Sequence, residues 1–150
     1  MWRRFSGWIY LVPVGRDVQR KEAIAEKVNY VIKLMTGEDR ASPDPDETGR
    51  QLGSLLDAGP RRLLVLDDVG HAEQLAPFLK GGRRCTRLVT TRMPALLAGR
   101  GEAVPVDEMS LEQARQLLTQ GLPQMAPTVE GGLLAATGRW PLLLRLVNKF

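Results

Sequence analysis

The fold is decided by the stretch RRLLVLDDV at residues 61–69. Its apolar middle is continuous rather than alternating, which is typical of a strand that is buried on both faces of a parallel sheet. Two adjacent acids, Asp67 and Asp68, follow this strand. Ligands bind at the carboxyl ends of the strands in open α/β folds, so both carboxylates are candidates for a ligand site. Taken alone, the stretch equally fits a strand that ends in a polar turn.

Three more apolar runs predict strands at residues 9–14, 87–90 and 103–106. Sequence with helical periodicity separates the runs, and it predicts helices at residues 18–35, 46–57 and 71–79. Strands that alternate with helices favour an α/β layer structure with right-handed crossovers. The fold class predicted for this part of the chain is therefore α/β with a parallel sheet flanked by helices.

The pattern changes to all-helical near residue 108. Ser110 and Gln113 form the capping-box pattern that begins a helix, and the sequence predicts this helix over residues 110–120. Two more helices are expected at residues 128–137 and 141–147. We therefore expect an α/β domain over residues 1–107, followed by a small helical subdomain over residues 108–150.

The composition of the 150 residues is that of a globular protein, with 43% hydrophobic and 25% charged residues. The single cysteine, Cys85, excludes an internal disulfide framework and fits the cytoplasm, and the single histidine, His71, offers little for zinc chemistry. No stretch approaches the ~20 apolar residues of a membrane span. The net charge of +4 comes from scattered basic residues, so a DNA-binding regulator ranks last among the hypotheses.

A second candidate group follows the strand in RLVTTR, at residues 87–92. An arginine at this edge of the sheet, Arg92, can reach a terminal phosphate with its planar guanidinium group. Taken alone, Arg92 fits a surface arginine or one half of a salt bridge better than it fits a phosphate contact. The stretch GRWPL at residues 138–142 fits the end of one helix and the start of the next.

Four stretches together resemble the NB-ARC ATPases, which are signal-transducing P-loop NTPases. They are LLVLDDV at residues 63–69, RLVTTR at 87–92, VPVDEMSLEQARQLL at 104–118 and TGRWPLLLRLV at 137–147. The resemblance covers nearly the whole chain, and it lies in the order and spacing of the stretches more than in any one of them.

The resemblance implies an ADP- or ATP-binding switch that uses Mg²⁺. Asp67 matches the Walker B aspartate that serves Mg²⁺, and Asp68 matches the adjacent acid associated with hydrolysis. Arg92 matches the sensor arginine that reads the terminal phosphate. Gly138 and Pro141 belong to a variant of the Gly-Leu-Pro-Leu motif, whose proline packs near the adenine, with one extra residue before the proline here.

The sequence departs from that family in one respect, because no G-x-x-x-x-G-K-[ST] occurs in these 150 residues. That motif supplies the backbone cradle and the lysine that hold the phosphates. The resemblance implies that the P-loop strand and first helix would precede residues 9–14. We therefore expect an incomplete sheet and impaired nucleotide binding, and a chain that is marginally stable alone, dimerises or borrows a strand.

Two hypotheses on function remain open at this point. The first is a fragment of an ADP/ATP-dependent signalling switch, for which ATPase activity of this chain alone is not expected. The second is a non-enzymatic module that keeps the fold for contacts with other domains or proteins, including a second copy of itself. Membrane and nucleic-acid partners are not expected under either hypothesis.

Overall fold

The computed structural model describes residues 8–39 and 41–149, and the chain divides into two compact units between Glu102 and Ala103. The first unit contains a parallel sheet of β1 (Ile9–Pro13), β2 (Arg62–Asp67) and β3 (Cys85–Val89), in the order β1-β2-β3. The predicted α/β class is confirmed, and the strands predicted at residues 9–14, 63–66 and 87–90 form as β1, β2 and β3.

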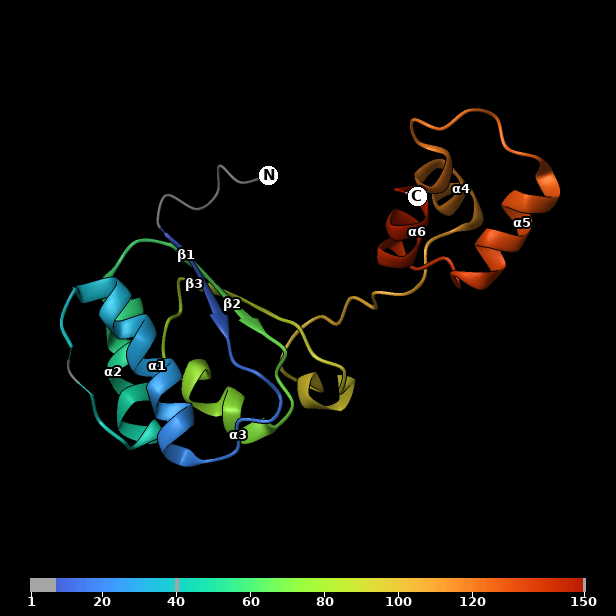
Figure 1. Cartoon of the computed structure of the whole chain (residues 1–150). Helices are drawn as coiled ribbons and strands as arrows, with labels where there is room; N and C mark the ends of the chain where they lie inside the picture. Colours follow the sequence, from blue (N-terminus) through green and yellow to red (C-terminus); the bar gives the residue numbers. More distant parts are fainter. Residues whose placement is uncertain (1–7, 40, 150) are drawn as a thin grey trace. The chain divides into compact units, whose positions relative to one another are not determined.

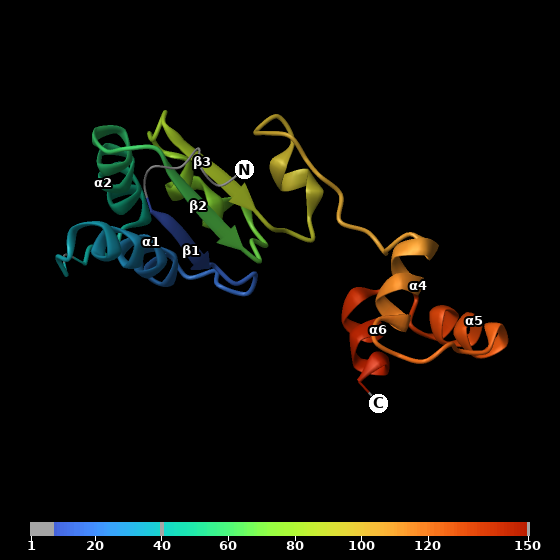
Figure 2. The ribbon, with the colours of Figure 1, turned by 90° about the horizontal axis from the view of Figure 1, so that it is seen from above.

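Helices α1 (Lys21–Thr36) and α2 (Pro45–Ala58) connect β1 to β2, and Figure 1 and Figure 2 show them side by side on one face of the sheet. The predicted helix at 71–79 forms as α3 (Ala72–Leu75) followed by the 3₁₀ helix η2 (Ala76–Leu79). Pro77 lacks the backbone N–H that an α-helix needs at that position, which explains why the α-helix ends there. A second 3₁₀ helix, η3 (Pro94–Leu97), follows β3.

The core of the first unit lies between the sheet and these helices. Alternate residues of β1 and β2 point into it and meet the apolar sides of α1 and α2. Its fully buried side chains include Val12, Val28, Ile32, Leu52, Leu56, Leu64, Leu66 and Phe78. The helices predicted at residues 18–35 and 46–57 form as α1 and α2, and both contribute buried apolar side chains to this core.

The opposite face of the sheet is apolar and exposed. Leu11 lies opposite Val65 in the register, and Val65 lies opposite Leu88. Leu11 is 61% exposed and Leu88 is 54% exposed, and Ile9 at 46% extends the same face. Among the described residues, helices cover only one face of β1 and β3, so these two strands are not buried on both faces.

The prediction of a fourth strand at residues 103–106 was also wrong. These residues have no regular secondary structure, and Val104 and Val106 are 77% and 88% exposed. A strand needs a neighbouring backbone to accept and donate hydrogen bonds. No described residue pairs with this segment, so its β-branched residues alone do not make it a strand.

The second unit contains α4 (Leu111–Thr119), α5 (Pro127–Ala136) and α6 (Pro141–Asn148), which pack around Leu118, Leu134 and Leu144. The predicted capping box is present: Ser110 Oγ accepts from the Gln113 N–H at 3.2 Å, and Gln113 Oε1 accepts from the Ser110 N–H at 3.1 Å. None of the described helices is long and apolar enough to cross a bilayer.

Candidate functional site

The candidate site lies where β2 and β3 end, at the carboxyl edge of the sheet. The backbones stay paired past the strands, because the Thr90 N–H donates to the Leu66 carbonyl at 2.9 Å and the Val69 N–H donates to the Thr90 carbonyl at 3.0 Å. This pairing sets the two acids beside the residues that follow β3. A pocket of about 450 Å³ opens there, lined by Asp67, Asp68, Thr90, Thr91 and Arg92.

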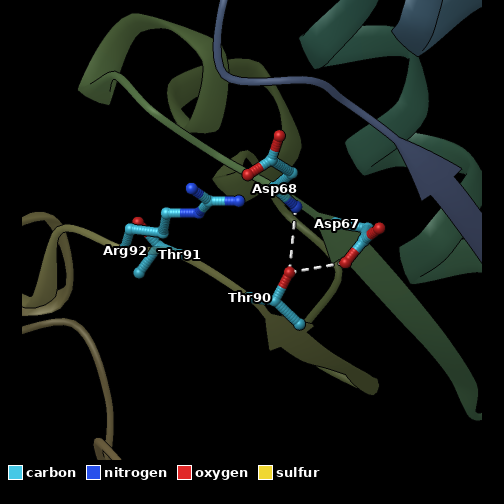
Figure 3. Close-up of a pocket in the computed structure, with 5 residues that line it drawn as sticks. All are labelled: Asp67, Asp68, Thr90, Thr91 and Arg92. Atoms are coloured by element: carbon cyan, nitrogen blue, oxygen red, sulfur yellow. Dashed lines mark hydrogen bonds between the residues drawn. The ribbon is translucent and has the colours of Figure 1, made fainter. Parts of the chain in front are cut away.

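The hydroxyl of Thr90 connects the two acids (Figure 3). Thr90 Oγ1 donates to Asp67 Oδ1 at 2.6 Å, and it accepts a hydrogen bond from the backbone N–H of Asp68 at 2.9 Å. The Asp67 carboxylate is thereby held in one orientation. Its second oxygen, Oδ2, receives no hydrogen bond from the described part of the chain, and the side chain is exposed to the pocket.

Asp68 has an unusual backbone conformation, with a φ of 55°. Aspartate tolerates this left-handed region better than most residues, but the conformation is still costly and is concentrated at functional sites. The hydrogen bond to Thr90 fixes the Asp68 peptide from one side. On the other side, the Arg16 N–H lies 3.5 Å from Asp68 Oδ2, which is at the long limit of a hydrogen bond.

Arg92 follows β3 and is exposed, and Figure 3 shows its guanidinium group pointing toward Asp68. Among the described residues, no carboxylate forms an ion pair with it within 4 Å. An arginine without a carboxylate partner keeps its donors available for a bidentate contact with a phosphate. Arg92 is therefore placed to meet an anion that enters the pocket.

A second, smaller pocket of about 240 Å³ adjoins the first and shares Asp68 and Arg92 with it. Its remaining lining residues come from the loops that follow β1 and β2: Arg16, Asp17, Val69, Gly70, His71, and also Met93. The sequence indicated no role for His71. Its ring Nε2 atom lies 3.2 Å from the side-chain Nε2 atom of Gln19. The loop after β1 is thus part of the same site.

The donor atoms present fit Mg²⁺ better than a metal that needs a full set of protein ligands. No group of three or more His, Cys, Asp or Glu side chains among the described residues could hold a metal ion. Mg²⁺ commonly takes one or two carboxylates and fills its other positions with water and substrate phosphates. Asp67 Oδ2 meets that requirement, and Asp68 is adjacent.

The structure brings together three of the residues singled out in the sequence: Asp67, Asp68 and Arg92. Gly138 and Pro141 belong to the second unit, where Gly138 follows α5 with a φ of 55° and Pro141 begins α6. Their contact with a base stays a prediction. The sequence did not single out the Thr90 hydroxyl; the available signal was a hydroxyl residue directly after the strand that pairs with the acid-bearing strand.

Comparison with known proteins gives similarity to one kind of regulator. No protein-family model matches the chain. The chain is 37% identical over 146 residues to the regulatory protein AfsR of Streptomyces griseus. This match covers 94% of this chain and 15% of the relative. It is 34% identical over 146 residues to the regulatory protein AfsR of Streptomyces coelicolor. This match covers 94% of this chain and 14% of the relative. The chain thus spans about 15% of the length of the curated relatives it matches.

Proposed function

We propose that this chain belongs to a regulatory protein, and that its first unit forms the metal- and terminal-phosphate-binding half of an ADP/ATP-dependent switch of the NB-ARC type. The observation that carries this proposal is the convergence of Asp67, Asp68, Thr90 and Arg92 on one pocket. The similarity to AfsR, which extends over both units, supports the regulatory part of the proposal.

Each residue of the pocket has a defined task in this proposal. Asp67, oriented by Thr90, would hold Mg²⁺ through Oδ2, and the bound Mg²⁺ would neutralise charge on the phosphates. Asp68 would orient a water molecule near the terminal phosphate. Arg92 would pair with that phosphate through its two parallel N–H groups.

Arg92 is also the residue that would make the site respond to the nucleotide bound. A ligand shifts a conformational equilibrium only by its difference in affinity for the two states. ATP has the γ-phosphate that Arg92 would contact, and ADP lacks it. The presence of that contact would thus distinguish the two nucleotides.

The affinity of this chain alone should be low. The 150 residues contain no G-x-x-x-x-G-K-[ST], so they lack the lysine and the backbone cradle for the β- and γ-phosphates. We expect weak binding that depends on Mg²⁺, and no appreciable ATP hydrolysis.

The proposal is tested by titrating the chain with a fluorescent ATP analogue in the presence of Mg²⁺. Asp67→Asn removes the negative charge and one of the two oxygens of the proposed metal ligand. Binding should weaken by roughly 10- to 100-fold, because a charged contact contributes about 1.5–3 kcal/mol. Glu26→Gln on the exposed side of α1 is the matched control, since it removes the same charge away from the pocket. Absence of binding at millimolar nucleotide, or equal binding by both variants, would overturn the proposal.

The exposed sheet face favours a second candidate function, a module that makes protein contacts without nucleotide. Ile9, Leu11 and Leu88 lie on this face with about half of each side chain exposed. Exposed apolar patches of this kind mark interaction sites, and a second copy of the chain is the occupant that we would test. Sedimentation velocity should then show a dimer that Leu11→Lys converts to a monomer; a monomer at all concentrations would exclude self-association.

A further inference from the structure

Gln74 in α3 is a polar side chain that is fully buried, with 0% of it exposed. Burying an amide is unfavourable unless its donors and its acceptor are hydrogen-bonded. The amide oxygen accepts two bonds from the loop after β2: Gly70 N–H donates to Oε1 at 2.8 Å and His71 N–H donates at 3.0 Å. These bonds fix the short segment that leads from Asp68 into α3.

The amide nitrogen of Gln74 is bonded to a different loop, the one after β1. Nε2 donates to the carbonyl of Val18 at 2.6 Å and to that of Gly15 at 2.8 Å, with a longer contact to Arg16 at 3.3 Å. The glutamine amide offers two N–H donors and an acceptor oxygen together at the end of its side chain. A carboxylate could not donate to these carbonyls, and an apolar side chain would leave backbone groups of both loops unpaired.

The two loops that Gln74 connects are in close contact. A β-carbon on Gly70 would lie 2.7 Å from the Cβ of Arg16 and 2.8 Å from its carbonyl oxygen. Arg16 is also the residue whose N–H faces Asp68 Oδ2. The distance between the loops therefore determines the position of Asp68 relative to Arg16.

We propose that Gln74 is a positioning residue for this site: its amide holds the loop at residues 15–18 against Gly70 and His71, and thereby sets the position and backbone conformation of Asp68. Thr90 fixes the Asp68 peptide from the side of β3, and Gln74 fixes the following residues from the side of α3. The functional meaning of Asp68 rests on the proposed function, but the effect of Gln74 on Asp68 is measurable without nucleotide.

The experiment compares the ¹⁵N-labelled chain with Gln74→Met, which keeps the length of the side chain and removes the amide. In the variant, the amide hydrogens of Gly70 and His71 should exchange faster, and the Asp68 amide signal should move. Affinity for Mg²⁺ and the fluorescent ATP analogue should fall by roughly tenfold, since several backbone hydrogen bonds are lost together. Gln116→Met, on the exposed side of α4, is the matched control and should change none of these.

A purely structural role for Gln74 has a different signature. In that case Gly70 and His71 would exchange faster while the Asp68 signal and the affinity stayed as in the wild type, which would overturn the proposal. If the wild-type chain binds no nucleotide, the proposed function fails, and the Asp68 signal alone then decides whether Gln74 positions that residue.

Gln74→Glu keeps the proposal testable if Gln74→Met does not fold. The introduced carboxyl group is buried, and one of its oxygens faces three carbonyl oxygens; both effects raise its pKa above the ordinary value for glutamate. The Gly70 and His71 N–H groups, which face its other oxygen, act in the opposite direction and are fewer. When protonated it can again donate to the loop after β1, and when ionised it cannot. The Asp68 signal should therefore approach the wild-type position at about pH 5.5 and depart from it at about pH 8. A signal that differs from wild type equally at both pH values would overturn the proposal.

Discussion

A methyl group at Gly70 is expected to destabilise the first unit, because Gly70 lies against the backbone of Arg16. The added Cβ would lie 2.7 Å from the Cβ, 2.8 Å from the carbonyl oxygen and 2.9 Å from the Cα of Arg16. Carbon atoms in contact are normally about 3.5–4.0 Å apart, so the loops must separate by close to 1 Å. Both sides of this contact consist mainly of backbone, so no side chain can rotate away.

The cost of Gly70→Ala follows from two opposing effects. Forcing extra volume into a packed position costs about 1–3 kcal/mol. Replacing glycine restricts the unfolded chain, which returns about 0.4–1 kcal/mol when the native backbone angles suit alanine. The φ of Gly70 lies outside the left-handed region, so this gain applies. The net expectation is a loss of about 1–2 kcal/mol, which lowers the Tm of a domain of this size by roughly 5–15 °C.

Urea unfolding followed by circular dichroism, with amide exchange of Leu64 as a probe of the first unit, measures this loss. Gly101→Ala is the matched control, because Gly101 also lies in a loop of the first unit, has no positive φ and has nothing within 4 Å of an added Cβ. The control should be neutral or slightly stabilising. If Gly70→Ala unfolds at the same urea concentration as the control, the result would contradict the close contact between Gly70 and Arg16.

Three further substitutions test other parts of the structure. Gly53→Ala in α2 should destabilise the first unit by about 1 kcal/mol in urea unfolding, because the added Cβ would lie 2.6 Å from the Lys80 carbonyl oxygen. This net loss is expected although alanine favours helices over glycine by a similar amount. The Lys80 Nζ atom lies 2.7 Å from the Asp46 carboxylate, and its hydrogen bond and charge lower the pKa of Asp46. Lys80→Met should therefore raise this pKa toward its ordinary value in an NMR titration. The stability from this pair is present above the unfolded pKa and lost as the pH falls through the folded pKa, so acidification below about pH 4 should destabilise the variant less than the wild type. Ser110→Ala should destabilise α4 by about 1 kcal/mol, seen as faster exchange of the Gln113 amide, and unchanged exchange would contradict the capping box.

Local sequence predicted the first unit well because its elements are determined by local patterns. The continuous apolar run predicted β2, and helical periodicity predicted α1 and α2. The prediction failed at residues 103–106, where the side chains favour a strand but no described backbone pairs with them. Pairing depends on residues that are distant in the sequence, which no local pattern specifies.

The candidate site was partly predictable for the same reason. Asp67 ends β2, Asp68 follows it and Arg92 lies shortly after β3, so a parallel sheet brings them to one edge. Gln74 could not be predicted, because its partners Gly15 and Val18 are 59 and 56 residues away and its position in the sequence resembles that of an exposed helix residue. Its role is visible only when both loops are in place.

The location of the metal tests the central claim most directly. Mn²⁺ binds the same oxygen ligands as Mg²⁺, and it broadens the NMR signals of nearby nuclei. Added to the ¹⁵N-labelled chain with excess ATP, it should first broaden the amide signals of Asp67, Asp68 and Thr91. The acidic segment GEDRASPDPDET at residues 37–48 is the internal alternative, since it contains five carboxylates. Broadening confined to that segment, or equal throughout the chain, would contradict a metal- and phosphate-binding site at the ends of β2 and β3.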